Sequence, residues 1–148
     1  MTVFASPAER VAVLVAVTGT ASSTPLLTSW VSAQYAQQLM LIALLGDMAS
    51  ETIDISLQQA TSSGGAGAKN LKAATQLAAS AGANDSKQVV IGCDSNDLDA
   101  DGGFTFVAGR IVTGGATGGV VSIIVEGHGL RYMPATNFDN ATVIQVVA

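Results

Sequence analysis

Carboxylates at alternating positions make the run from Asp97 to Gly102 the part of the sequence best suited to chemistry. Asp97, Asp99 and Asp101 precede Gly102, and this spacing matches the first half of a calcium-binding loop. Such a loop also needs a bidentate glutamate at its twelfth position, which is Ala108 here. Two interpretations stay open: a weak calcium site on the three aspartates, and a solvated acidic turn leading into a strand. We favour the turn.

Nucleophilic catalysis needs a base that a third group orients, and the sequence offers few residues for this role. His128 is the single histidine, Cys93 is the single cysteine, and no serine lies in a Gly-x-Ser-x-Gly motif. Asp47 and Glu51 have the residue types of a glycosidase pair, although helix capping or solvation of a loop explains them as well. We expect no catalytic site, no cofactor and no enzymatic activity.

The basic residues argue against two classes of partner. The six lysines and arginines are scattered singly and the net charge is −5, whereas nucleic-acid binding needs clustered basic residues. The longest apolar runs, residues 11–17 and 39–45, are far shorter than the roughly 20 residues of a membrane-spanning helix. We therefore expect neither a nucleic-acid partner nor a membrane partner.

Charged residues are scarce, and this scarcity suggests a protein partner. They make up 11% of the chain, against about 25% in a typical soluble domain. Permanently buried interfaces are depleted of lysine, glutamate and aspartate, so we interpret much of the surface as contact area. The sparse aromatic residues Trp30, Tyr35 and Tyr132 are candidates for anchoring such an interface.

Short segments with strand patterns must position these side chains. Ile53, Ile55 and Leu57 alternate with polar residues, which is the pattern of a strand with one wet face. Residues 38–45 are apolar at almost every position and suit a strand buried on both faces. Eight strands are expected in all, at residues 11–17, 38–45, 53–58, 71–79, 87–93, 104–112, 120–125 and 143–147.

Close strand spacing, with glycine-rich loops at residues 61–68 and 114–119, indicates a mainly β fold. We predict a single domain that is an antiparallel β-sandwich or jelly-roll-like. Residues 1–30 are expected to be an N-terminal arm or a first strand region, and residues 31–148 the sandwich domain. The apolar run 143–147 either closes a sheet or pairs with a neighbouring molecule, because an exposed edge strand would be sticky.

Four motifs of the chain form a recognisable set: Leu57-Gln-Gln-Ala-Thr61, Gly65-Ala-Gly-Ala-Lys69, Lys87-Gln-Val-Val-Ile91 and Leu98-Asp-Ala-Asp-Gly-Gly-Phe-Thr105. As a set they resemble motifs of small virion proteins from tailed bacteriophages, and Ser29-Trp-Val31 and Leu45-Gly-Asp-Met48 also fit. The resemblance covers residues 28–134.

The resemblance implies a capsid-associated structural protein located in the virion and assembled in the cytoplasm of the bacterial host. Decoration of the head, by a cement protein bound to the major capsid protein, is the role we expect. A homo-oligomer such as a trimer is expected with it. The alternatives are a head-tail connector, a tail or head-fibre protein and, from another class, a carbohydrate-binding module that uses Trp30 and the acidic turn. No functional residue is carried over from the family.

Overall fold

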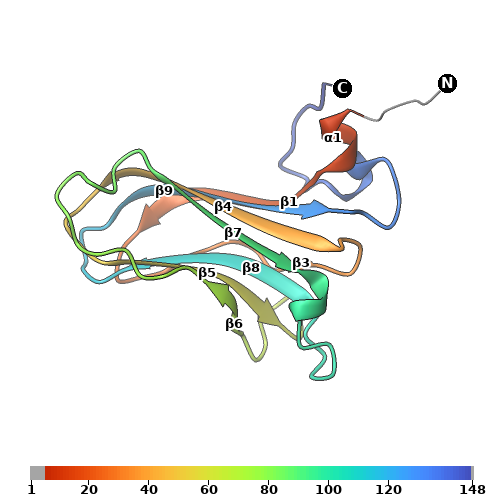
Figure 1. Ribbon diagram of the computed structural model, residues 1–148, viewed down its shortest axis with the longest axis horizontal. Helices are drawn as coiled ribbons and strands as arrows, with labels where there is room; N and C mark the ends of the chain where they lie inside the picture. The colour runs from red at the N-terminus through yellow and green to blue at the C-terminus, as the bar shows by residue number, and fades with distance from the viewer. Residues whose placement is uncertain (1–5, 148) are drawn as a thin grey trace.

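Two antiparallel sheets packed face to face make up most of the computed structural model, which describes residues 6–147 (Figure 1). Sheet A has the strand order β1-β9-β4-β7, and sheet B has the order β2-β8-β5-β6 with β3 also paired to β8. The strands of sheet A are β1 (Ala12–Ala21), β4 (Gln38–Met48), β7 (Gln88–Asp94) and β9 (Gly119–His128). The strands of sheet B are β2 (Leu26–Leu27), β3 (Val31–Ser32), β5 (Ile53–Ala60), β6 (Lys69–Ala73) and β8 (Phe106–Thr113). The helical elements are α1 (Pro7–Arg10), η1 (Ser95–Asp97) and η2 (Ala135–Phe138).

The core lies between the sheets and is aliphatic. Successive side chains of a strand point to opposite faces, so Leu39 and Leu41 of β4 point inward toward Ile55 and Leu57 of β5. In the described part of the chain, the largest fully buried side chains are all leucine, isoleucine or valine. The predicted mainly β, antiparallel sandwich is therefore confirmed.

Gly109 of β8 lets the two sheets approach each other closely. A Cβ atom added there would lie 2.6 Å from Cγ2 of Ile123 and 2.9 Å from Cδ1 of Leu41, both in sheet A. The same glycine ties down the segment between β2 and β3, because its N–H donates to Thr28 Oγ1 and its carbonyl accepts the Thr28 N–H, each at 3.0 Å. A larger residue would force the sheets apart.

The strand expected at residues 71–79 is shorter and begins earlier. β6 covers Lys69–Ala73, and beyond it only isolated contacts with β5 remain. The Ala74 N–H donates to the Ile55 carbonyl, and Leu77 forms a single bridge with Ile53. Within residues 6–147, no helix has the length and apolar character needed to cross a membrane.

The N-terminal region joins both sheets. β1 pairs with β9 along its whole length, and β2 pairs with β8 in the other sheet. Residues 12–27 are thus part of the sandwich and do not form an arm, because their apolar side chains fill the core at one edge. Residues 1–5 of the expected arm lie outside the described residues.

Residues 143–147 do not close a sheet within the chain, since this segment pairs with no strand of the described residues. Asp139 and Asn140 reach the edge of β1 first. There the Val13 N–H donates to Asp139 Oδ1 at 2.8 Å, and the Asn140 N–H donates to the Val13 carbonyl at 2.7 Å. A turn then forms, with the Val143 N–H donating to the Asn140 carbonyl, and the following residues leave the sheet (Figure 1).

Candidate interaction surface

The outer face of sheet A carries a row of apolar side chains that crosses all four strands. In the sheet register, Ile124 of β9 lies opposite both Ile42 of β4 and Ala16 of β1, and Ile42 also lies opposite Val90 of β7. The side chain of Val90 is 60% exposed, Ala16 is exposed, and both isoleucines are half-buried. These four residues, one from each strand, are called the apolar row.

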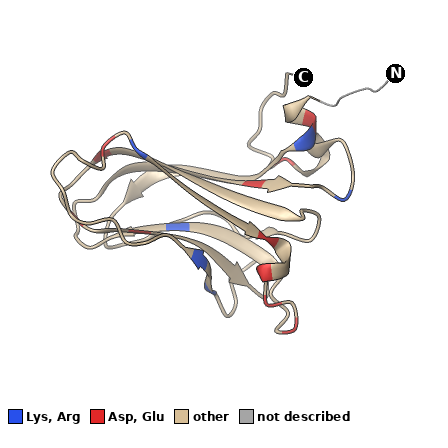
Figure 2. Cartoon of the chain, viewed as in Figure 1, with Lys and Arg blue, Asp and Glu red and all other residues tan. Residues whose placement is uncertain are grey.

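Further apolar side chains extend the row along the strands. Leu44 of β4 is 40% exposed and Val120 of β9 is 57% exposed, while Met40 of β4 is half-buried. Charged side chains stand at the ends of the strands, so the middle of sheet A is almost free of them (Figure 2). An apolar surface bordered by polar groups is typical of a protein–protein contact.

The outer face of sheet B differs because polar side chains cover it. Gln58 of β5 donates to Asn70 Oδ1 of β6 at 3.0 Å, and Gln76 donates to both carboxylate oxygens of Asp54. Arg110 of β8 lies opposite Ser56 of β5 on the same face. Antiparallel sheets commonly keep one face dry and one face wet, and sheet B follows this rule. Sheet A departs from it.

The departure arises from the composition of β4. Leu39, Leu41 and Leu45 point inward and are buried, but Met40, Ile42 and Leu44 point outward and are apolar as well. Residues 38–45 were expected to be buried on both faces, and the chain by itself covers only the inner face. The described chain therefore leaves the outer side chains of β4 at least partly exposed.

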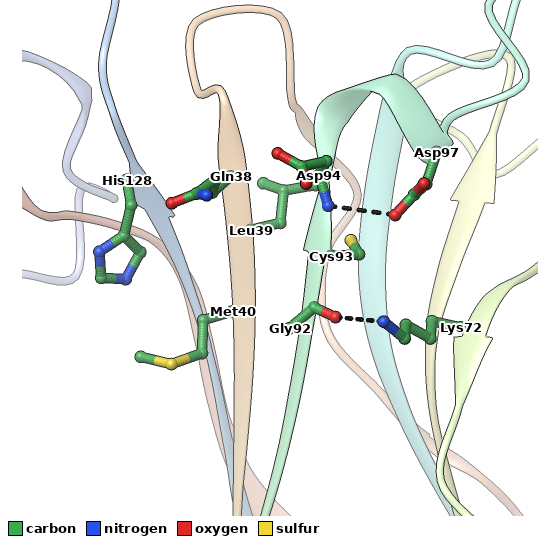
Figure 3. Close-up of a pocket in the computed structure, with 9 residues that line it drawn as sticks. All are labelled: Gln38, Leu39, Met40, Lys72, Gly92, Cys93, Asp94, Asp97 and His128. Carbon is green, nitrogen blue, oxygen red and sulfur yellow. Dashed lines mark hydrogen bonds between the residues drawn. The ribbon is translucent and has the colours of Figure 1, made fainter.

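A cavity of about 400 Å³ lies at one end of this outer face, beside η1 (Figure 3). Met40 and His128 line it from sheet A, and Lys72 reaches it from β6 and donates to the Gly92 carbonyl at 2.7 Å. Cys93 also lines the cavity. Burial raises the pKa of its thiol to about 11; the negative charges of Asp97 and Asp94 also raise this pKa, and the positive charge of Lys72 lowers it. A thiol with this pKa is protonated at neutral pH, so Cys93 is a poor nucleophile there.

Two of the three aspartates of the acidic turn, Asp97 and Asp99, have partners within the chain. The Asp97 carboxylate accepts the Asp94 N–H, while Asp99 binds Lys69 Nζ at 2.5 Å and accepts the Gly102 N–H at 3.0 Å. The hydrogen bond from Lys69, followed by that from Gly102, lowers the pKa of Asp99. Across residues 6–147, no three His, Cys, Asp or Glu side chains gather closely enough to hold a metal ion. The Asp97 and Asp99 carboxylates therefore have partners within the chain, and this favours the acidic turn over a calcium site.

The remaining candidates for chemistry also have partners within the chain. His128 Nε2 lies 3.2 Å from Glu126 Oε2 on the same strand. The Glu51 carboxylate accepts the N–H groups of Thr117 and Gly118, at 3.1 and 3.0 Å, and so fixes the loop before β9. The Asp47 side chain is exposed, and its residue lies at the bulge of β4.

The aromatic interface candidates fall into two places. Tyr35 stacks on Phe138 with ring centroids 5.2 Å apart and lies 6.3 Å from the ring of Tyr132, so the three form one cluster near η2 in which the two tyrosines are exposed and Phe138 packs against the core. Trp30 lies instead against the glycine-rich loop, where a Cβ on Gly65 would be 2.4 Å from its Nε1 atom. Gly65 has φ +80°, which suits glycine, and this close approach requires glycine a second time.

The comparisons with protein-family models, with curated proteins and with solved structures find no match to this chain.

Sequence analysis named only some of the exposed apolar and aromatic residues described above. It named Tyr35 and Tyr132 but missed Val90, Leu44 and Ile124, although the apolar composition of residues 38–45 was a signal for part of this surface.

Proposed function

We propose that this chain is a structural protein of a tailed-bacteriophage virion that decorates the head and cements its shell. The observation that carries the proposal is the apolar outer face of sheet A, which the chain leaves uncovered. The motifs shared with small virion proteins supply the identity of the assembly. Its partners are the major capsid protein and further copies of itself, and the protein is located in the virion and is not an enzyme.

The size of sheet A is adequate for a specific contact. Strands of 10, 11, 7 and 10 residues, with a rise of about 3.3 Å per residue and a spacing of about 4.8 Å, give a face of roughly 600 Å². A standard protein–protein interface buries about 800 Å² on each partner. Sheet A thus supplies most of the required area, and the aromatic cluster of Tyr35, Tyr132 and Phe138 and the adjoining loops supply the rest.

Burial of the apolar row would also contribute favourable free energy to binding. Covering exposed apolar surface contributes about 25 cal/mol per Å², so each half-exposed valine, leucine or isoleucine adds on the order of 1 kcal/mol. Because few charged groups lie in the middle of the face, little desolvation opposes this gain. A face with this apolar row and few charged groups suits binding to another protein better than it suits binding a small ligand.

Cementing follows from selective binding. A subunit that binds the assembled shell but not the free capsid protein shifts the equilibrium toward the shell. Several copies joined in one oligomer multiply the effect, since each further contact becomes intramolecular. We therefore expect the strength of cementing to depend on self-association as well as on the face of sheet A.

Co-sedimentation with purified virion parts tests the proposal. The full-length protein is mixed separately with heads that lack it, with tails, and with immobilised glycans. We expect it to pellet with heads and to raise the temperature at which the heads rupture. Binding to tails alone would favour the connector, tail or head-fibre alternative, and binding to glycans alone would favour a carbohydrate-binding module. Either outcome would overturn the decoration role, as would binding to none of the three.

A further inference from the structure

The segment after Asn140 has the composition of a strand but no strand beside it. Val143, Ile144, Val146 and Val147 are all β-branched, and Gln145 is the single polar residue among them. The side chain of Ile144 is 99% exposed and that of Val147 is 80% exposed. Among the hydrogen bonds of the described residues, none involves the backbone of residues 144–147. Residues 143–147 are called the donor segment.

The free edge of β7 offers matching backbone groups. β7 is the last strand in the order of sheet A, so one of its sides has no neighbour within the sheet. The Leu45 N–H donates to the Lys87 carbonyl at 2.8 Å, which makes Leu45 and Lys87 a hydrogen-bonded pair. Such pairs alternate along an antiparallel ladder. Residues 89, 91 and 93 therefore bond to β4, while residues 88, 90, 92 and 94 direct their N–H and C=O groups to the free side.

Two contacts support this assignment and show where the edge is open. The Gly92 carbonyl accepts Lys72 Nζ and the Asp94 N–H donates to Asp97, and both contacts lie on the free side (Figure 3). Lysine and a short helical turn thus close the end of the edge nearest η1. Around Val90 nothing in the described chain closes it, and the Val90 side chain there is 60% exposed.

The donor segment and the open edge of β7 lie at opposite edges of sheet A. Asn140 is fixed to Val13 of β1, and β1 and β7 are the two outermost strands of the sheet. Asn140 lies outside β1 and an added strand would lie outside β7, so five strand spacings of about 4.8 Å, roughly 24 Å in total, must be crossed. Seven residues, 141–147, span at most about 24 Å. Pairing of this segment within one molecule would therefore leave it no residue to pair, and the turn at Val143 shortens this reach further.

We propose that residues 143–147 of one molecule add as a strand to the free edge of β7 in a second copy of the same chain. Each copy then donates a strand at one edge of sheet A and accepts one at the other. A head-to-tail contact of this kind closes into a ring or continues as a filament, and a trimer is one such ring. This inference deepens the self-association in the proposed function and rests on it, whereas binding to heads does not require it.

The side chains fit the same arrangement. Neighbouring residues on paired strands share a face, so one alternate set of the donor segment lies beside Val90 on the outer face of sheet A. The alternate set made of Ile144 and Val146 contains no polar residue, whereas the other set contains Gln145. Placed there, they extend the apolar row by a fifth strand, and Gln145 takes the other side.

Two single variants and their mixture test the proposal by analytical ultracentrifugation of the full-length protein. Val90→Pro removes an N–H that points to the free side, so it blocks the acceptor edge without breaking the ladder with β4. Ile144→Asp places a charge in the donor segment at a position that touches nothing in the chain itself. We expect the wild-type protein to be oligomeric and each variant to sediment as a monomer. The equimolar mixture should form a heterodimer, because it restores one intact donor and one intact edge.

Matched controls separate pairing from side effects. Gln145→Asp adds the same charge at the polar position and Val90→Ala keeps the edge N–H, so both should still associate. If Val90→Pro melts far below the wild-type protein, Val90→Lys replaces it as the edge variant. A monomeric wild-type protein, an Ile144→Asp variant that associates as the wild type does, or a mixture without heterodimer would each overturn strand donation. Binding of monomers to heads would leave the decoration role standing, and oligomers that ignore heads would remove only that role.

Discussion

Ile42 of β4 and Ile124 of β9 face each other across the ladder on the outer surface of sheet A, and both residues are only partly buried. The preceding residue on β4, Leu41, faces Val125 on the inner surface, and both of these are fully buried. Two adjacent pairs of the same two strands thus have nearly the same apolar character but opposite surroundings. Folding buries one pair fully and leaves the other pair partly exposed.

The two faces of β4 should differ in their contribution to stability. Leu41→Ala removes a side chain that is 0% exposed and should lower the free energy of unfolding by about 2–5 kcal/mol. Leu44→Ala removes the same atoms from a position that is 40% exposed and should cost less than about 1 kcal/mol. Urea unfolding of the isolated protein measures both. Equal losses would show that the outer face is already covered within the chain.

Cys93 should make stability depend on alkaline pH. Burial raises the pKa of its thiol from the ordinary value of 9.0 to about 11, so the unfolded chain loses this proton first as the pH rises. The contribution of the protonated thiol is complete below pH 9 and is lost as the pH rises from about 9 to about 11. Across this range, the free energy of unfolding should fall more steeply for the wild-type protein than for Cys93→Ala. Parallel pH profiles would contradict the burial of a neutral thiol.

Calcium should not bind the acidic turn. Lys69 and the Gly102 N–H already occupy the Asp99 carboxylate, and Asp97 caps the start of η1. Titration with millimolar calcium should release no heat in calorimetry and should leave the melting temperature unchanged. Binding heat that disappears in an Asp97→Asn variant would restore the calcium interpretation.

A strand could be predicted from the sequence where apolar and polar residues alternate along it. The alternation of Ile53, Ile55 and Leu57 with polar residues predicted β5 correctly, because inward and outward positions differ in polarity along that strand. For residues 143–147 the same reasoning left two outcomes open, and closure of a sheet within the chain is the one that the structure contradicts. High strand propensity shows that a segment suits a sheet, but it does not show whether an edge lies within reach. Here Asn140 and the turn after it direct the segment away from β1.

The apolar row on the outer face of sheet A could not be predicted, because its residues come from strands that are distant in the sequence. Ile42, Val90 and Ile124 become neighbours only through the register of β4 with β7 and β9, which no local pattern reveals. The acidic turn is a similar case, since Lys69 lies 30 residues before its partner Asp99. The spacing of the aspartates suggested ligands for a metal ion, but it could not show that Lys69 binds the Asp99 carboxylate.

Binding of an outer-face variant to heads tests the central claim most directly. Ile42→Asp places a charge in the middle of the apolar row, and Gln58→Asp places the same charge on the polar outer face of sheet B as its control. Co-sedimentation of both folded variants with heads is compared with that of the wild-type protein. We expect Ile42→Asp to bind at least about tenfold more weakly, a loss of about 1.4 kcal/mol or more, and Gln58→Asp to bind as the wild type does. Unchanged binding of Ile42→Asp would contradict the assignment of the outer face of sheet A as the contact surface.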